Sequence, residues 1–355
     1  MRPPGRHFEA PAEAPARRPE VGLVLPQMEG AMAGETPRWP DLQAMARAAE
    51  AAGFDSLWVI DHLLLNARGE QARRKGVWEC WSLLAALAAT TSRVRLGSLV
   101  TATSLRHPAM LAKIVDTVDE ISGGRLILGL GAGSYRSEHD AFGLPFDHPV
   151  GRFEEAVQII RRLLRGEAVD FEGSYYTVRD CELRPRPARA AGPPVLIGTI
   201  RQGERMLRLV AEHADFWNAW LSFGRSDADQ IPPLRAAVDA ACRAAGRDPA
   251  TLRRTASVLV DLTRGDFYGA DVPMRLRDRQ AVEPLAGTPA ELAAAIRAFA
   301  SEGVSHLQVS LAPNTLAGVE AFAEVLGLLG EGEAGPRPRG SAGVARAARA
   351  LEAER

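Results

Sequence analysis

Short apolar runs alternate with helical patterns along the whole chain, and this alternation leaves few folds open to it. The runs are nearly continuous hydrophobic stretches, as expected for parallel strands that are covered on both faces. They lie at residues 21–26, 55–60, 94–100, 125–131, 194–198, 215–220, 255–262 and 306–311. Because each run is followed by a helical pattern, the sequence predicts a parallel sheet that closes into a (β/α)8 barrel of the TIM type.

An open, doubly wound sheet is the alternative architecture. It would carry a glycine-rich dinucleotide fingerprint after the first strand, where this chain has Gln27-Met28-Glu29-Gly30. Two stretches interrupt the barrel pattern. Residues 168–178 are predicted to form a β-hairpin, and residues 263–287 have a length typical of a lid or binding loop. We therefore expect a barrel with insertion loops.

Composition divides the chain into one domain and two tails. Of its 355 residues, 46% are hydrophobic and 25% are charged, which suits a globular protein with a substantial core. Residues 1–20 and 330–355 are biased toward Pro, Arg, Ala, Gly and Glu, and such segments bury too little apolar surface to order themselves. Residues 21–329 are therefore expected to form the barrel domain.

Charge and cysteine usage argue against several classes of protein. The net charge of −1 creates no strong field for nucleic acid, and no apolar run approaches a membrane span of roughly 18 residues. The chain start lacks the apolar stretch of a secretory signal. Three cysteines at long spacings, without a CxxC pair, favour a reducing compartment and no metal site. These features predict a cytoplasmic protein without nucleic-acid or membrane partners.

In such barrels the working residues gather at the C-terminal ends of the strands. The second predicted strand ends at Asp61-His62, a pair that can hydrogen-bond a ring edge or move a proton near neutral pH. A histidine that merely satisfies a nearby backbone group is an equally good explanation. At the third strand, the hydroxyls of Thr101 and Thr103 stand at alternate positions, face the same side and could donate to a ring carbonyl. The commonness of threonine in strands is the favoured explanation when this feature is taken alone.

The fourth and fifth strands end in small residues. Gly129, Gly131 and Gly133 alternate along the fourth strand and leave one of its faces bare, which indicates that something flat or another backbone comes close. We favour the close approach of a ring over mere packing within the barrel. After the fifth strand, Gly198-Thr199 leads into a helix whose free N–H groups can bind an anion. An ordinary strand-to-helix turn explains the second feature equally well.

Several other catalytic classes lack their signatures. The chain contains no HExxH or DxDxDG metal motif and no G-x-S-x-G serine elbow. A retaining glycosidase needs two carboxylates about 5 Å apart. Asp261 ends the seventh strand, but Glu138 lies well beyond the fourth strand and offers no clear partner for it.

Several sequence blocks together resemble the signature of the luciferase-like monooxygenases. The resemblance extends over residues 21–329, and it is specific for the family rather than for a substrate. The blocks that carry it are residues 92–97, 106–109, 122–125, 128–133, 138–143, 152–155, 194–198 and 214–218. The resemblance implies an eight-stranded barrel that uses either FMN or the deazaflavin coenzyme F-420.

The family pattern also implies roles for individual residues. Asp61 and His62 match a pair beside the cofactor ring, with His62 as the candidate catalytic residue. Ser98-Leu99 matches a non-prolyl cis peptide that supports the ring, and further ring or phosphate contacts fall on Thr101, Gly131, Ala132, Gly133, Gly198 and Thr199. Two departures stand out. Ser134-Tyr135 replaces a commoner Trp, and Thr199-Ile200 replaces a commoner Gly-Gly.

Three functions agree with this resemblance. We favour an oxidoreductase that uses coenzyme F-420 for hydride transfer with a small organic substrate, because the overall similarity and the Asp61-His62 pair resemble that branch. The alternatives are an FMN-dependent monooxygenase supplied by a separate reductase and a barrel that binds a flavin without turnover. The resemblance also implies a homodimer. His62 is expected to orient the substrate or to shuttle a proton.

Overall fold

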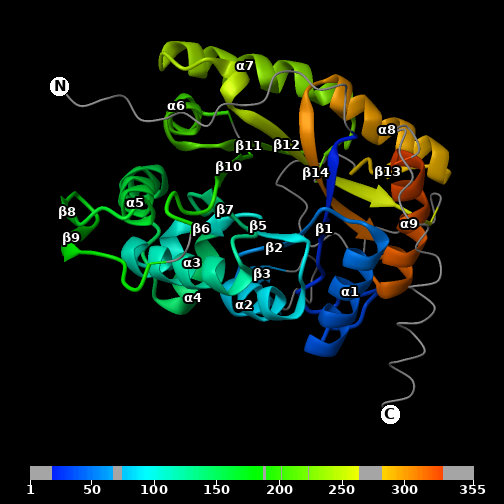
Figure 1. Cartoon of the computed structure of the whole chain (residues 1–355), viewed down its shortest axis with the longest axis horizontal. Helices are drawn as coiled ribbons and strands as arrows, with labels where there is room; N and C mark the ends of the chain where they lie inside the picture. Colours follow the sequence, from blue (N-terminus) through cyan, green and yellow to red (C-terminus); the bar gives the residue numbers. More distant parts are fainter. Residues whose placement is uncertain are drawn as a thin grey trace.

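A computed structural model describes residues 18–66, 74–186, 189–200, 202–222, 224–263 and 282–330. These residues form a ring of strands surrounded by helices (Figure 1). Residues 1–17, 331–355 and most of the long loop expected at 263–287 lie outside the described ranges. The expected tails are therefore described only at Arg18–Glu20 and at Gly330.

Eight parallel strands close the barrel, as the sequence predicts. Each predicted run contains one strand, with ends shifted by a few residues at most. The first strand pairs in parallel with the last, and Glu20 lies opposite His306. In order around the barrel the strands are β1 (Glu20–Val24), β2 (Ser56–Val59), β5 (Arg95–Ser98), β7 (Leu126–Gly131), β10 (Val195–Thr199), β11 (Phe216–Trp220), β12 (Arg253–Asp261) and β14 (Val304–Ala312).

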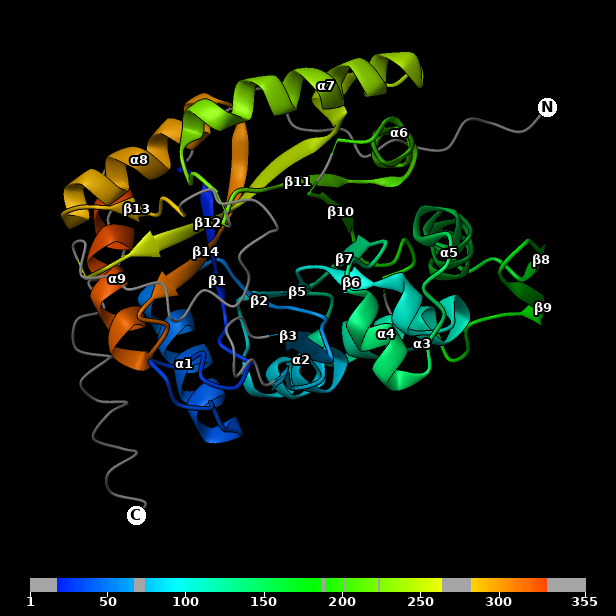
Figure 2. The same cartoon turned by 180° about the vertical axis from the view of Figure 1, so that it is seen from behind.

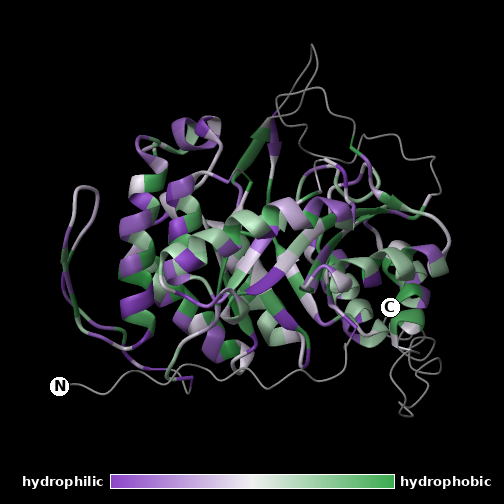
Figure 3. Cartoon of the chain, turned by 90° about the horizontal axis from the view of Figure 1, so that it is seen from above, coloured by the Kyte–Doolittle hydropathy of each residue, from purple (hydrophilic) through white to green (hydrophobic). Residues whose placement is uncertain are grey.

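Amphipathic helices cover the outside of the barrel. Their apolar faces pack on the strands, and each outer ribbon in Figure 3 carries both hydrophobic and hydrophilic stretches. Thr288 and Glu291 form the predicted capping box of α8. The barrel helices are α1 (Trp39–Ala52), α2 (Cys80–Thr90), α3 (Pro108–Ser122), α5 (Pro149–Leu164), α6 (Glu204–His213), α7 (Ile231–Ala244), α8 (Pro289–Ser301) and α9 (Leu316–Gly330).

Short elements are inserted between the barrel units. The predicted hairpin is present as the antiparallel pair β8–β9, which projects at the edge of the molecule away from α9 (Figures 1 and 2). The Glu155 carboxylate binds three backbone N–H groups at its turn and ties it to α5. The inserted elements are β3 (Leu64–Asn66), β4 (Arg74–Gly76), β6 (Thr101–Ala102), η1 (Thr103–Leu105), α4 (Arg136–Phe142), β8 (Val169–Glu172), β9 (Thr177–Cys181), η2 (Ala228–Gln230), η3 (Pro249–Thr251) and β13 (Leu285–Ala286).

The indole of Trp58 fills the lower interior of the barrel. This side chain is fully buried, and it lies where side chains at Gly22 and Gly97 would otherwise project. A Cβ atom at either glycine would overlap the indole. Its Nε1 donates to Oγ of Ser56, which lies 2.8 Å from Nε2 of His306. The barrel is therefore closed beneath its C-terminal mouth, and a ligand has to bind above this indole.

A second set of buried polar side chains lies on β11, β12 and β14. Nδ2 of Asn218 donates to Oγ1 of Thr255 at 2.9 Å and to Oε1 of Gln308 at 2.8 Å. Oγ of Ser257 donates to Oδ1 of Asn218 at 3.2 Å. These bonds link three neighbouring strands across the interior.

No helix among the described residues is long and apolar enough to cross a membrane.

Candidate functional site

The bare glycine face at the barrel mouth is covered by a bulge from the neighbouring strand. A Cβ atom at Gly129 would overlap the carbonyl oxygen of Ser98, so only glycine permits this approach of two backbones. Cβ atoms at Gly131 and Gly198 would lie 2.7 and 3.2 Å from the methyl groups of Val100. Of the two explanations for the bare face, the structure shows the approach of another backbone with its side chain. These glycines accommodate the bulge, and partly exposed Val100 forms the apolar surface above them.

The cis peptide of the bulge lies one bond later than the resemblance implies. It joins Leu99 to Val100 rather than Ser98 to Leu99. Ser98 still belongs to β5, and its hydroxyl donates to the carbonyl of Gly129 at 2.9 Å. The N–H of Leu99 continues the ladder by donating to the carbonyl of Val59 at 2.7 Å. The chain therefore leaves the sheet only after Leu99.

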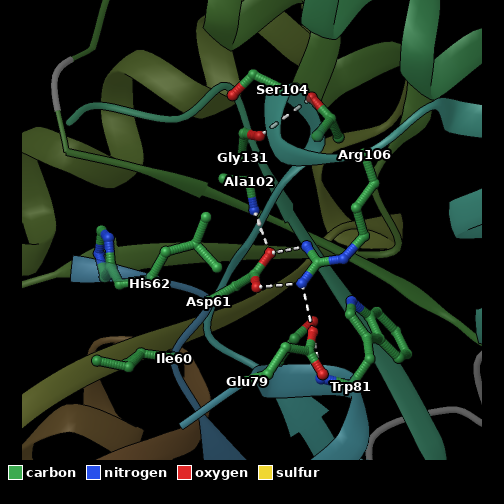
Figure 4. Close-up of polar contacts among 12 residues, drawn as sticks. Ile60, Asp61, His62, Glu79, Trp81, Ala102, Ser104, Arg106 and Gly131 are labelled. Atoms are coloured by element: carbon green, nitrogen blue, oxygen red, sulfur yellow. Dashed lines mark hydrogen bonds and ion pairs between the residues drawn. The ribbon is translucent and has the colours of Figure 1, made fainter. Parts of the chain in front are cut away.

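Asp61 lies in a buried ion-pair network. Its carboxylate binds both terminal nitrogens of Arg106, at 2.7 and 2.9 Å, and accepts the N–H of Ala102 at 3.1 Å. Arg106 also pairs with Glu79 at the start of α2 (Figure 4). Burial raises the pKa of the Asp61 carboxyl, and the Arg106 guanidinium opposes that shift. The Asp61 and His62 side chains diverge in Figure 4, so Asp61 anchors the strand end beneath His62.

His62 is held by a carboxylate from a different element. Its Nδ1 lies 3.1 Å from Oε1 of Glu138, which is fully buried on α4. The other carboxylate oxygen accepts the N–H of Leu63 at 2.8 Å. The ring of Tyr135 meets the imidazole edge-on, with 5.1 Å between centroids. The His62 side chain is 19% exposed, so part of the imidazole remains accessible.

The Thr101 hydroxyl is a buried polar atom next to the bulge. It has no hydrogen-bond partner among the described residues, although Thr101 is fully buried. A buried hydroxyl normally finds a partner, so an orphan of this kind suggests a bound group or water. Thr101 directly follows Val100 in the chain and begins β6. An apolar surface and an unpaired hydroxyl therefore adjoin at the mouth, a combination that fits a flat heterocycle.

The loop after β7 is shaped by a buried histidine and serine. Gly133 has a left-handed φ of 81°, and a Cβ atom there would lie 2.5 Å from Oγ of Ser104. Ser104 Oγ lies 2.8 Å from Nε2 of His139 and 3.3 Å from the carbonyl of Ala132. Gly131 ends the strand beneath Val100. The predicted run Gly131–Gly133 therefore lies at the mouth, where it contacts Val100, Ala102, Thr103 and Ser104.

Gly198 and Thr199 lie at the end of β10, on the same rim. The Thr199 hydroxyl accepts the indole N–H of Trp217 at 2.9 Å, and Gly198 remains partly exposed. Helix α6 follows, with Gly203 at its N-cap and no side-chain cap. Free N–H groups at such a helix start attract anions. The predicted phosphate-binding role therefore has a suitable position, while Arg201 lies outside the described residues.

Sequence reasoning missed the two residues that organise this site, Arg106 and Glu138. Both lie in the blocks that resemble the family signature, which was the available signal for them. The sequence offers Glu138 as a distant carboxylate partner for Asp261, whereas the structure pairs it with His62. Among the described residues, no group of His, Cys, Asp and Glu side chains is arranged to hold a metal ion.

Comparison with known proteins agrees with this geometry. The model of the luciferase-like monooxygenase family matches residues 20–266. A phthiodiolone/phenolphthiodiolone dimycocerosates ketoreductase of Mycobacterium tuberculosis is 32% identical over 288 residues, which cover 76% of this chain and 71% of that protein. A 5,10-methylenetetrahydromethanopterin reductase of Archaeoglobus fulgidus is 35% identical over 178 residues, which cover 50% of this chain and 48% of the reductase. The match to the reductase thus spans about half of its length.

Solved structures show the same fold at lower identity. An F-420-dependent secondary alcohol dehydrogenase in complex with an F-420–acetone adduct superposes with a TM-score of 0.71 at 20% identity. The match covers 88% of this chain and 99% of the dehydrogenase. A monooxygenase from Streptomyces bottropensis gives 0.67 at 23% identity, with coverage of 86% and 98%. The chain belongs to the luciferase-like monooxygenase family and is an oxidoreductase built on its (β/α)8 barrel.

Proposed function

We propose that this protein transfers hydride between coenzyme F-420 and a small organic substrate. The observation that carries the proposal is the apolar surface of Val100 beside the unpaired, buried Thr101 hydroxyl. An F-420-dependent glucose-6-phosphate dehydrogenase of Kineococcus radiotolerans, 29% identical over 75% of this chain and 85% of its own, adds support. The residues that would contact the cofactor are Val100, Thr101, Gly198 and Thr199, with Ser98, Leu99, Gly131, Ala132 and Gly133 forming the bulge and the loop that support them.

The residues of the chain would bind the cofactor, orient the substrate and transfer a proton. When bound, a deazaflavin accepts a hydride from a substrate carbon or returns one to it. Val100 of the bulge would contact the ring of the deazaflavin. His62 then exchanges a proton with an oxygen of the substrate, and the uncapped start of α6 binds the phosphate end.

Binding of the two cofactor classes tests the proposal directly. Oxidised F-420 should quench or shift its own fluorescence on titration with the purified chain and should bind at least tenfold more tightly than FMN. Competition between the two should show a single shared site. Preferential binding of FMN, with oxygen consumption once the flavin is reduced, would instead favour the monooxygenase. Binding of neither cofactor would contradict both proposals.

Replacement of His62 by alanine should separate binding from turnover. The His62 imidazole forms no hydrogen bond with Val100 or Thr101, so F-420 affinity should stay within about twofold. Turnover with a panel of secondary alcohols and ketones should fall by about 10² or more, the usual contribution of a positioned acid–base group. His148→Ala removes an exposed imidazole and is the matched control. A His62→Ala protein with unchanged turnover would remove this role.

A further inference from the structure

The strand end that carries His62 is fixed from several sides. The Gln27 side chain accepts the N–H of Ile60 at 2.6 Å and donates to the carbonyl of the same residue at 2.9 Å. Asp61 is bound by Arg106, and the N–H of Leu63 is bound by Glu138. Successive residues from 60 to 63 are thus each tied to another element. The backbone of His62 is therefore fixed, and only the orientation and protonation of its imidazole can still vary.

The Glu138 carboxylate fixes the orientation of the His62 imidazole. Burial alone would raise the pKa of this carboxyl, but hydrogen bonds from the His62 ring and from the Leu63 N–H hold the pKa below its usual value. Glu138 is therefore ionised at neutral pH, and an ionised carboxylate can only accept hydrogen bonds. Its partner at 3.1 Å, Nδ1 of His62, has to carry the proton.

The carboxylate is itself held in place by the neighbouring residue on α4. Nδ1 of His139 lies 2.8 Å from the carbonyl of Tyr135, and its Nε2 lies 2.8 Å from Oγ of Ser104. A carbonyl can only accept, so Nδ1 of His139 donates its proton to Tyr135. Glu138 and His139 thus tie α4 to the loops after β2 and after β6. Neither side chain is exposed.

We propose that Glu138 is a positioning residue that fixes neutral His62 as the Nδ1–H tautomer and leaves Nε2 as the proton-accepting atom at the barrel mouth. Nε2 has no hydrogen-bond partner among the described residues. An accepting nitrogen selects a substrate that offers a hydrogen-bond donor, such as the hydroxyl of an alcohol. The catalytic consequence rests on the proposed hydride-transfer function, whereas the tautomer itself does not.

Glu138→Gln provides a test because it changes the charge and keeps the shape. The N–H of Leu63 still needs an acceptor, so the amide oxygen of Gln turns toward it. The amide NH2 group then faces His62 and donates to Nδ1, which moves the imidazole proton to Nε2. The substitution therefore inverts the tautomer while both hydrogen bonds persist. The matched control is Glu50→Gln, which changes a carboxylate that binds backbone N–H groups at residues 92–94, far from the mouth.

Nitrogen-15 NMR of histidine-labelled protein reads the tautomer without cofactor or substrate. The spectrum is recorded at a pH where the imidazoles are neutral, and the His62 signals are assigned by their loss in His62→Gln. We expect Nδ1–H in the wild type and in Glu50→Gln, and Nε2–H in Glu138→Gln. A wild-type Nε2–H tautomer overturns the proposal, and so does a Glu138→Gln protein that retains Nδ1–H. The wild-type spectrum decides the assignment even if the variant folds poorly.

Kinetics then separate this inference from the proposed function. In Glu138→Gln, kcat for alcohol oxidation with F-420 should fall by about 10² or more, while KM changes by less than about threefold. A variant with an inverted tautomer and unchanged kcat would overturn the positioning role. Failure of the wild type to bind F-420 would contradict the hydride-transfer proposal and would leave the NMR result on Glu138 standing.

Discussion

Gly129→Ala is expected to destabilise the barrel by at least about 3 kcal/mol, because the added methyl group meets a backbone atom that cannot move aside. The position where it would lie overlaps the carbonyl oxygen of Ser98. That carbonyl belongs to a strand that is fixed by pairing with β2 and by the Ser98–Gly129 hydrogen bond. To remove this overlap, β5 and β7 would have to separate, and that separation would break hydrogen bonds between the two strands of the closed sheet.

The measurement is urea or thermal unfolding followed by circular dichroism. Gly327→Ala is the matched control, because a Cβ atom there has no heavy atom within 4 Å and the residue lies inside α9. Alanine is favoured over glycine in a helix by about 0.5–1 kcal/mol, so this variant should be slightly more stable than the wild type. Equal stability of the two variants would contradict the close approach of β5 to β7.

Acid should weaken the fold well before its carboxylates are protonated, because His306 is buried without charge. Burial holds the pKa of His306 at about 3, against an ordinary value of 6.5, and nearby Arg95 and Arg253 act in the same direction while Glu20 opposes them. Below pH 6.5 the His306 imidazole binds a proton in the unfolded chain but not in the folded chain. The free energy of unfolding therefore falls as the pH falls. Between about pH 6.5 and 4.5 the loss should be about 2–3 kcal/mol.

His306→Gln isolates this effect. Glutamine keeps a polar group near the Ser56 hydroxyl and cannot titrate. The variant should be less stable at neutral pH, but its free energy of unfolding should vary less between about pH 6.5 and 4.5 than that of the wild type. His213, whose pKa burial also lowers, is present in both proteins and cancels in the comparison. Parallel curves for the two proteins would show that His306 does not titrate in this way.

The barrel could be predicted because each of its strands is an apolar run of nearly the right length. The run predicted at 306–311 extends to Val304–Ala312 in the structure, because Val304 and Ala312 also pair with β12. Helix α4 was missed for the opposite reason. Its seven residues contain little apolar periodicity, and Glu138 and His139 are buried by hydrogen bonding rather than by hydrophobic packing.

The glycine-rich strand shows how far the site could be predicted. Alternating glycines indicated a close approach correctly, but the sequence could not identify what approaches. The atoms that fill the space belong to Ser98 and Val100, about thirty residues earlier. Asp61 was likewise identified as important, whereas its binding to Arg106 depends on the distance between two loops. Local sequence patterns were enough to locate the barrel mouth. The contact partners of these residues could be identified only from the three-dimensional structure.

The pairing of β1 with β14 also has a consequence for how the protein is made. Glu20 and His306 are the opposed residues of a contact that spans most of the chain, so the sheet stays open until the last strand has left the ribosome. Until then, β1 and β12 each present an unpaired edge that can recruit a strand from another nascent chain. Ribosomal pauses or truncations before residue 304 would therefore favour aggregation, and chaperone demand should be greatest in that interval.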